Sequence, residues 1–320
     1  MIRRTWQSGM IALARSAGVK RFMHGSRAAS SLASRYVAGA SAEDGLNRAR
    51  QLFETRNLRS SLFYLGEYVS TPELVATNVE QKHKIASLLG PSGLDVHVSV
   101  DPTQIGYMLD AAQAREHAFS IARTIATASG GREGVHVLML DMEDQSVTDA
   151  TIALHDALQE ADLPVALTLQ AYLKRTEADL QRQIARGSKV RLVKGAFAAG
   201  EAIAFTRQND IKANSRRLID LMLSKEARES GFYPIIATHD TKLHEHAINR
   251  ARENGWRADQ WEFEMLLGVR SDVAESLARA GHRTRLYVPF GQDWWPYAVR
   301  RIGENPRNAW LLARSILAPA

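Results

Sequence analysis

The sequence predicts an α/β protein, a closed (β/α)8 TIM-like barrel preceded by a helical arm. Short apolar segments rich in β-branched residues recur eight times, and each is followed by a stretch with helical periodicity. Strand then helix, repeated at intervals of roughly 20 to 40 residues, is typical of a parallel α/β fold. An open, doubly wound sheet is the alternative, but eight units and the polar residues at the strand ends favour the barrel.

Each expected strand is a short apolar run, and most of these runs end in polar residues. The strands are expected at residues 62–69, 96–100, 136–140, 165–171, 190–193, 234–238, 261–266 and 286–288. The polar residues at their ends are Glu67, Asp101, Asp141, Glu143, Asp144, Gln170, Lys194, His239, Asp240, Glu264 and Tyr287. In a barrel all parallel strands end on one face, where active sites are built. The pattern therefore predicts a polar site on that face.

Residues 1–58 precede the first strand and are expected to form a helical arm, which leaves 59–320 as the barrel. Within the arm, Ser41 and Asp44 have the spacing of a helix start ahead of a run of apolar positions. The arm is strongly basic, because seven Lys or Arg residues precede the first acidic residue, Glu43.

An acid-free basic start has two further interpretations. It has the composition of a mitochondrial transit peptide. It also fits a basic amphipathic helix on an anionic membrane, since several apolar residues between Trp6 and Ala14 roughly share a face. We favour an arm packed on the barrel. The expected location is the cytoplasm, with peripheral contact at the inner face of the membrane as an option, or the mitochondrion if the start is a transit peptide.

Composition excludes several classes of protein. The chain has no cysteine, which rules out disulfides, Cys-ligated zinc and thiol catalysis. No apolar run approaches the roughly 18 residues of a membrane span, so a soluble or peripheral protein is expected. Beyond the arm, acids and bases nearly balance within the net charge of +6, so no nucleic-acid partner is expected. Neither a G-x-G-x-x-G motif nor a P-loop occurs.

The segment 285–308, RLYVPFGQDWWPYAVRRIGENPRN, carries the most functional information. A strand is expected to stop at Pro289 and Gly291, and a helix to begin near Pro296. Four polar residues at i, i+3, i+4 and i+7 share one face of that helix: Tyr297, Arg300, Arg301 and Glu304. Paired guanidiniums suit a carboxylate or a phosphate. The alternative is a solvated helix face with an ordinary i, i+4 ion pair.

This segment resembles the end of the proline dehydrogenases, which reads Y-x-P-x-G and then Y-x-x-R-R-x-x-E. Four further motifs extend the resemblance: LDMED (140–144), LQAY (169–172), RLVKGAF (191–197) and ATHD (237–240). The resemblance implies an FAD-dependent barrel enzyme that oxidises L-proline, a small cyclic amino acid, to 1-pyrroline-5-carboxylate. It also implies a membrane quinone as the electron acceptor.

The same residues make chemical sense around a flavin. Lys194 and the backbone of Gly195 and Ala196 offer positive charge and close N–H groups to a pyrophosphate. The resemblance extends the cofactor-binding set to Met142, Gln170, Arg191, Lys194, Gly195, Ala196, Thr238 and His239. For Arg191 and Gln170 the alternative is an internal salt-bridge layer, since buried charges are often merely paired.

The resemblance also assigns catalytic and substrate-binding roles. In the family, the carboxylate and the phenol that match Asp141 and Tyr287 are hydrogen-bonded to each other at the substrate pocket, and the arginine that matches Arg191 lies near the reactive part of the flavin. The resemblance therefore implies that Asp141, Arg191 and Tyr287 are the catalytic residues. The alternative is an ordinary structural hydrogen bond between a buried Asp and a buried Tyr. The substrate-binding set is Asp101, Leu266, Tyr297, Arg300, Arg301 and Glu304.

Four departures from the family pattern bear on the substrate: Asp101 stands where relatives have Lys, Phe197 for Tyr, Glu264 for Gln, and Leu267 for Tyr or His. Flavin binding is therefore better supported than specificity for proline, and a related cyclic amino acid such as hydroxyproline is an alternative substrate. A metal-dependent hydrolase on the same barrel is a weaker alternative, built on His97, His136, His239 and Asp141. No metal is expected, because these histidines lack the context of a metal motif.

Overall fold

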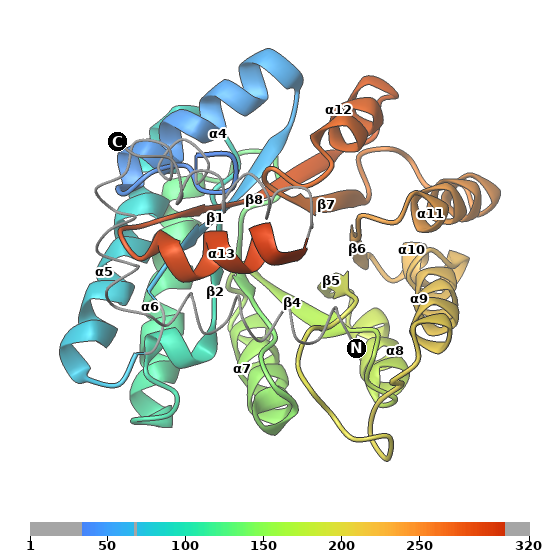
Figure 1. Cartoon of the computed structure of the whole chain (residues 1–320), viewed down its shortest axis with the longest axis horizontal. Helices are drawn as coiled ribbons and strands as arrows, with labels where there is room; N and C mark the ends of the chain where they lie inside the picture. The colour runs from blue at the N-terminus through green and yellow to red at the C-terminus, as the bar shows by residue number, and fades with distance from the viewer. Residues whose placement is uncertain (1–33, 67–68, 305–320) are drawn as a thin grey trace, which may run out of the picture.

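The computed structural model describes residues 34–66 and 69–304, apart from the side chains of residues 299, 300 and 302–304. Within these residues, eight parallel strands pair in chain order and β8 closes on β1, so the predicted barrel is confirmed (Figure 1). The strands are β1 (Arg59–Tyr64), β2 (His97–Val100), β3 (Val137–Leu140), β4 (Val165–Gln170), β5 (Lys189–Val193), β6 (Tyr233–Ala237), β7 (Glu262–Leu266) and β8 (Thr284–Phe290).

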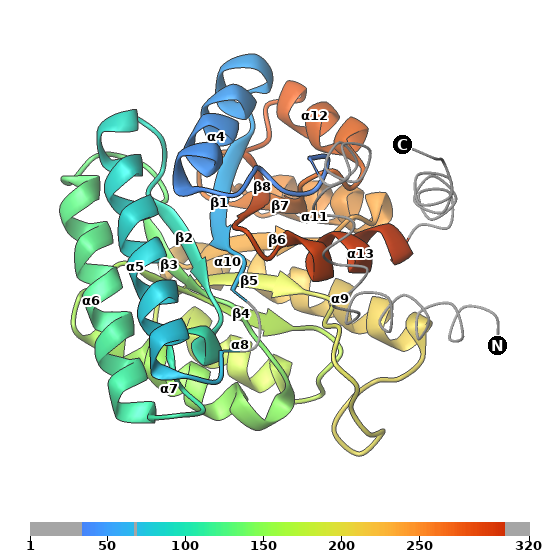
Figure 2. The same ribbon diagram turned by 60° about the vertical axis from the view of Figure 1, so that its left-hand side comes forward.

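Helices form a ring around the barrel, and α13 lies across one end of it (Figures 1 and 2). The α-helices are α4 (Ala42–Arg56), α5 (Pro72–Leu89), α6 (Ala111–Ser129), α7 (Thr148–Glu160), α8 (Thr176–Ala185), α9 (Gln208–Met222), α10 (Lys225–Glu229), α11 (Thr241–Glu253), α12 (Ser271–Arg279) and α13 (Trp294–Glu304). Single 3-10 turns are η1 (Gly90–Ser92), η2 (Pro102–Ile105) and η3 (Gln145–Val147). No described helix is long and apolar enough to cross a membrane.

Helix α4 begins where the sequence predicts. The Ser41 hydroxyl accepts from the Asp44 N–H at 3.1 Å, and the Asp44 carboxylate accepts from the Ser41 N–H at 3.0 Å, which completes a capping box. The buried face of α4 packs on β1 and β8. Residues 1–33, to which the transit-peptide and membrane-helix interpretations apply, lie outside the described residues. The boundary of the arm at residue 58 stays a prediction.

Two strand boundaries differ from expectation. Strand β1 covers Arg59–Tyr64, so it starts and ends earlier than predicted, and Glu67 lies outside the described residues. Pro289 was wrongly expected to end the last strand, which continues to Phe290. Proline is tolerated because the pairing of β8 with β7 extends only to Tyr287, so no β7 carbonyl faces the missing N–H.

The core has an apolar layer outside the strands and a largely polar interior. Leu, Ile, Val and Ala side chains from strands and helices fill the outer layer. Full burial of each Leu, Ile or Val side chain stabilises the fold by about 1.5–3 kcal/mol. A small apolar cluster inside the barrel includes Val137, Met139, Ala166 and Ile235. Charged side chains occupy the interior on either side of it.

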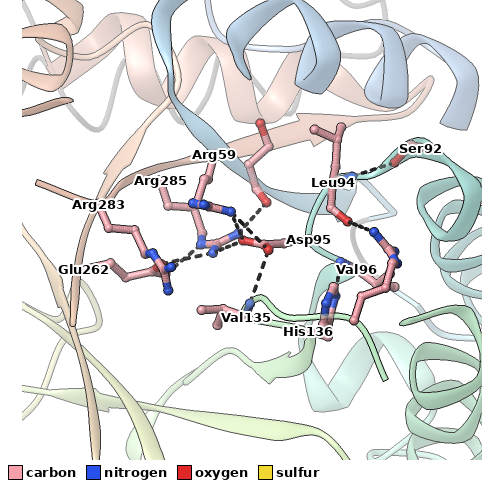
Figure 3. A network of polar contacts seen from close by, with 12 residues as sticks. Arg59, Ser92, Leu94, Asp95, Val96, Val135, His136, Glu262, Arg283 and Arg285 are labelled. Atoms are coloured by element: carbon pink, nitrogen blue, oxygen red, sulfur yellow. Dashed lines mark hydrogen bonds and ion pairs between the residues drawn. The ribbon is translucent and has the colours of Figure 1, made fainter. Parts of the chain in front are cut away.

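Near the amino ends of the strands, the buried Arg285 holds two carboxylates (Figure 3). Its guanidinium donates to Glu262 at 2.7 and 3.0 Å and to Asp95 at 2.7 Å. A further N–H reaches the Ser60 carbonyl at 2.9 Å, and Arg59 adds two bonds of 3.2 Å to Asp95. Burial opposes ionisation of Asp95, but Arg285 and Arg59 outweigh it and lower its pKa to about 2. This network fills the barrel at the amino ends of the strands, and the charges of its carboxylates are paired there.

Candidate active site

A second buried arginine, Arg191 on β5, organises the carboxyl end of the barrel. It donates to Asp141 after β3, to Glu264 on β7 at 2.9 Å, and through Nε to the Thr168 hydroxyl at 3.1 Å. Strands β3 and β7 are not neighbours of β5, so these bonds cross the barrel interior. The internal ion layer that the sequence left as an alternative is therefore present, and it extends to the strand ends.

Tyr287 connects this network to the substrate side predicted from the sequence. Its hydroxyl donates to the second oxygen of Asp141 at 2.7 Å, and its ring lies 5.5 Å from the Arg191 guanidinium carbon. Burial raises the pKa of Tyr287 well above its ordinary value, and the charges of Asp141 and Asp101 raise it further. Tyr287 therefore remains a phenol at neutral pH, and it holds Asp141 by donating rather than accepting.

Glu264 lies inside strand β7 rather than at its end, which corrects the position expected from the sequence. One of its oxygens accepts from Arg191, and the other has no hydrogen-bond partner among the described residues. Burial raises the pKa of Glu264, although Arg191 opposes the shift. A protonated Glu264 has the donor and acceptor pattern of a glutamine, the residue that the family pattern has at this position.

The predicted cofactor residues gather at the ends of β5 and β6. A cavity of about 270 Å³ lies between these strand ends and helices α9 and α11, and Lys194, Thr238, Lys212 and Asp240 contribute to its lining. Small-molecule sites usually occupy about 300–1,000 Å³, so the cavity suits part of a dinucleotide rather than all of one. Lys194 is exposed, so its ammonium is open to a phosphate.

The backbone at Gly195 is held against a tyrosine. Gly195 has φ +94°, and a Cβ at this position would meet the Tyr172 ring at 2.1 Å, so a side chain is excluded. Tyr172 also donates its backbone N–H to the Lys194 carbonyl at 3.0 Å. Its buried hydroxyl has no partner in the described part of the chain. An orphaned hydroxyl beside half-buried Gly195, whose neighbours Lys194 and Ala196 are exposed, fits a polar ligand.

His239 is a neutral donor in this environment. The backbone N–H of Leu266 donates to its Nε2 at 3.0 Å, which places the ring proton on Nδ1. Burial lowers the pKa of His239 to about 4, and the charge of Arg301 contributes. Nδ1–H is therefore a permanent donor at neutral pH, and Nε2 is not free to bind a metal.

Gln170 and Met142 occupy the ends of β4 and β3. Gln170 is buried, and its amide N–H donates to the Glu143 carbonyl at 2.9 Å, which fixes the side chain. Met142 directly follows Asp141 and is buried. Both residues thus lie at the carboxyl end of the barrel, although the Met142 side chain packs in the apolar layer outside the strands.

Helix α13 brings the predicted substrate residues over this end of the barrel (Figures 1 and 2). Tyr297 is buried, and the Arg301 guanidinium carbon lies 5.5 Å from its ring centroid. The charge of Arg301 helps to lower the pKa of His239, which follows β6. Arg300 and Glu304 belong to the same helix, but their side chains are outside the described ones. Leu266, at the end of β7, is half-buried.

Sequence reasoning missed Lys82, a fully buried residue of α5. Its ammonium donates to Gln104 at 2.9 Å, and the charges of Asp101 and Asp141 act on it. Lys82 thus supplies a positive charge near Asp101, which stands at the position where the family pattern has a lysine. The available signal was a lysine at a core-facing position of an otherwise largely apolar helical stripe.

The histidines considered for a metal site are not brought together. His136 precedes β3 at the amino end of the barrel, where it accepts from the Val96 N–H at 2.8 Å. His239 follows β6 at the opposite, carboxyl end. His97, the first residue of β2, instead has ligand atoms within 4.8 Å of Glu262 and Glu264. Burial, and then Arg285 and Arg191, keep the pKa of His97 well below its ordinary value. A cation there would compete with two guanidiniums for the same carboxylates.

Comparison with known proteins connects this geometry to a family. The sequence profile described as proline dehydrogenase matches residues 46–314. Proline dehydrogenase 2 of Bacillus subtilis (strain 168) is 32% identical over 286 residues, which cover 89% of each chain. The proline dehydrogenase of Deinococcus radiodurans is 31% identical over 288 residues, which cover 89% of this chain and 90% of the relative.

Solved structures of larger proteins share the fold. Proline utilization A from Bdellovibrio bacteriovorus superposes with a TM-score of 0.76 at 19% identity, covering 90% of this chain and 33% of that one. The protein of the same name from Corynebacterium freiburgense gives 0.72 at 23% identity, covering 98% and 34%. This chain spans about a third of those structures, so the likeness concerns the barrel. Because the profile covers most of the sequence and a relative matches at 32% over nearly its full length, the chain belongs to the proline dehydrogenase family.

Proposed function

We propose that the protein is an FAD-dependent dehydrogenase that oxidises L-proline to 1-pyrroline-5-carboxylate. The observation that carries the proposal is the cross-barrel network of Arg191, Asp141 and Tyr287, which lies at the same end of the barrel as the cavity beside Lys194 in a chain of this family. Perturbed ionisable groups that converge beside a cavity are typical of catalytic sites.

The residues at the ends of β5 and β6 fit the cofactor. Lys194, Gly195 and Ala196 would hold the pyrophosphate, with Thr238 and the Nδ1–H of His239 as further donors. Gln170, Met142 and Arg191 would border the isoalloxazine ring, which when bound supplies the acceptor for a hydride from substrate C5. The orphaned hydroxyl of Tyr172 and the cavity support this assignment.

The substrate would bind below α13 with its carboxylate on Arg300 and Arg301. Two guanidiniums give a planar set of donors that fixes a carboxylate in one orientation. Tyr287, Tyr297 and Leu266 would surround the apolar ring, and Glu304 would complete the polar face of the helix. Asp141 positions the Tyr287 phenol, and the raised pKa of Tyr287 keeps its proton in place.

A second candidate substrate is another cyclic amino acid such as hydroxyproline. Asp101 favours it, because a carboxylate at the end of β2 can accept a hydrogen bond from a substrate hydroxyl. A metal-dependent hydrolase has less support, since Nε2 of His239 already accepts a backbone N–H.

We further propose that a membrane quinone is the final electron acceptor, and that the protein reaches it from the cytoplasm by peripheral contact. The basic residues before Glu43 support this location. Import into mitochondria is the alternative if that segment acts as a transit peptide.

The test is the visible spectrum of the purified protein, followed by anaerobic addition of L-proline. The proposal expects a flavin spectrum that bleaches with proline, with pyrrolidine as the control compound that lacks the carboxylate. Bleaching by hydroxyproline but not proline would establish the second candidate. A colourless protein that contains zinc would contradict both.

A further inference from the structure

Lys82 is a buried lysine, and none of its hydrogen bonds within the described residues is to a carboxylate. Its position on α5 lies on the stripe that packs on the barrel, together with Val75, Ile85 and Leu89, and its side chain is fully buried. Burying an ammonium is costly unless it meets compensating charge or hydrogen bonds. Its presence on this stripe therefore needs a reason.

Neutral groups hold the ammonium in place. It donates to Gln104 Oε1 at 2.9 Å and to Asn78 Oδ1 at 3.5 Å, and it lies 5.6 Å from the centre of the Tyr64 ring. The Gln104 amide N–H donates to the carbonyls of Tyr64 and Gly66, both at 3.2 Å, so its oxygen is fixed toward Lys82. This shell orients a charge without neutralising it.

The negative charges that act on Lys82 stand at the strand ends. Gln104 links Lys82 to Asp101, because its side-chain oxygen accepts from Lys82 and its backbone N–H donates to the Asp101 carbonyl at 2.9 Å. Asp101 follows β2 and Asp141 follows β3, and both charges raise the pKa of Lys82. Burial has the larger effect and lowers that pKa to about 7. Tyr64 is the other titratable group that faces it among the described residues. The charge of Asp101 also raises the pKa of Tyr287. Asp101 therefore acts both on Lys82 and on a residue of the proposed substrate pocket.

We propose that Lys82 and Asp101 form a charge couple that lets the pocket accept a carboxylate. Asp101 brings a negative charge to the end of β2, and Lys82 offsets that charge from outside the barrel wall. Lys82 is thus a positioning residue that acts through Asp101 and does not itself contact the substrate. This inference rests on the proposed function, because it assumes a substrate with a carboxylate.

The test measures binding of two probes to the flavin-loaded protein by calorimetry. Cyclopentanecarboxylate has the ring and the carboxylate of proline without the amine, and pyrrolidinium has the ring and the cation without the carboxylate. Lys82→Met should weaken cyclopentanecarboxylate binding about tenfold, which is the effect of one charge across roughly 10 Å at an effective dielectric near 20. It should leave pyrrolidinium binding unchanged or stronger. The control is Lys84→Met, an exposed residue of the same helix paired with Glu43, which should change neither.

Rescue separates the couple from a structural role. Asp101→Asn should tighten cyclopentanecarboxylate binding on its own, and the double variant Lys82→Met/Asp101→Asn should return to within about threefold of wild type. In wild type the affinity should fall as the pH rises from about 6 to 8, and Lys82→Met should remove that dependence. Asp101→Asn keeps the test open if Lys82→Met does not fold.

A double variant that binds cyclopentanecarboxylate as weakly as Lys82→Met alone, or equal weakening of both probes by Lys82→Met, overturns the charge couple. Wild-type protein that turns over proline, together with a double variant that is not rescued, overturns this inference alone. Wild-type protein that neither bleaches with proline nor binds cyclopentanecarboxylate overturns the proposed function as well.

Discussion

Two buried arginines stand in the barrel interior, Arg285 toward the amino ends of the strands and Arg191 toward the carboxyl ends. Each holds two acidic side chains, so their pairing chemistry is the same. At the amino end both oxygens of Glu262 accept from Arg285, and Arg59 covers Asp95 (Figure 3). Every carboxylate oxygen of Glu262 and Asp95 therefore already accepts a hydrogen bond from the described protein.

The network around Arg191 is open by comparison. Asp141 also accepts a hydrogen bond from Tyr287 at the strand ends, and one oxygen of Glu264 lacks a partner in the described chain. The cavity beside Lys194 lies at the same end of the barrel. A buried arginine paired with two carboxylates therefore does not by itself indicate a functional site. The neighbouring residues determine whether a polar group remains available to bind a ligand.

The largest expected effect is on stability, at the closed end. Arg285→Met leaves Glu262 and Asp95 buried without their main cation, so the free energy of unfolding should fall by about 3–5 kcal/mol. Chemical denaturation measures it. The control Arg56→Met removes a half-exposed pair with Glu275 and should cost no more than about 1 kcal/mol. Equal, small losses in both variants would refute a structural role for the closed network.

Acid should weaken the closed end. The pKa of Asp95 is lowered to about 2, so its stabilisation is present above the ordinary Asp pKa and is lost as the pH falls toward 2. The loss is about 2 kcal/mol. Denaturation between about pH 5 and 2 should show a smaller slope for Asp95→Asn than for wild type. An unchanged slope would contradict the pairing.

Tyr287→Phe should affect activity more than stability. It removes the 2.7 Å bond to Asp141, and kcat/KM for proline should fall about tenfold while FAD stays bound. Tyr233→Phe is the matched control, because its hydroxyl bonds Glu262 and Arg283 at the closed end. If Tyr233→Phe reduces kcat/KM as much, the two ends do not differ as described.

The smallest effect is expected for Glu264→Gln. Burial raises the pKa of Glu264, so its stabilisation is present at low pH and is lost as the pH rises above the ordinary Glu value. Gln keeps the acceptor for Arg191 and removes this pH dependence, so stability at neutral pH should change by less than about 1 kcal/mol. Glu262→Gln, which breaks the bidentate pair with Arg285, should cost several times more. Similar losses from the two substitutions would refute this prediction.

Much of the fold was predictable from the sequence, because alternating strand and helix periodicity is a local property. The helix start at Ser41 and the strand-end positions of Asp141, Lys194 and His239 follow from the same local patterns. The end of β8 was not predictable, because tolerance of Pro289 depends on where β7 stops pairing.

The charged interior was harder to predict than the strands. Arg285, Glu262 and Asp95 come from separate parts of the chain, and only barrel closure makes them neighbours. Lys82 has the sequence context of an ordinary helical lysine until α5 is packed on the strands. Tertiary pairing of charges leaves no periodic signal, so the closed network and the charge beside Asp101 both required the structure.

The most direct test of the difference between the two ends is the anaerobic rate of flavin bleaching by L-proline, per bound flavin, in Arg191→Lys and Arg285→Lys. Lysine keeps the charge at both positions and loses the planar fork. We predict at least a hundredfold slower bleaching for Arg191→Lys, and near-normal bleaching for the folded fraction of Arg285→Lys. The free energy of unfolding should fall less in Arg191→Lys than in Arg285→Lys. Normal bleaching in Arg191→Lys, or equal slowing in both variants, would contradict the assignment of function to the carboxyl end.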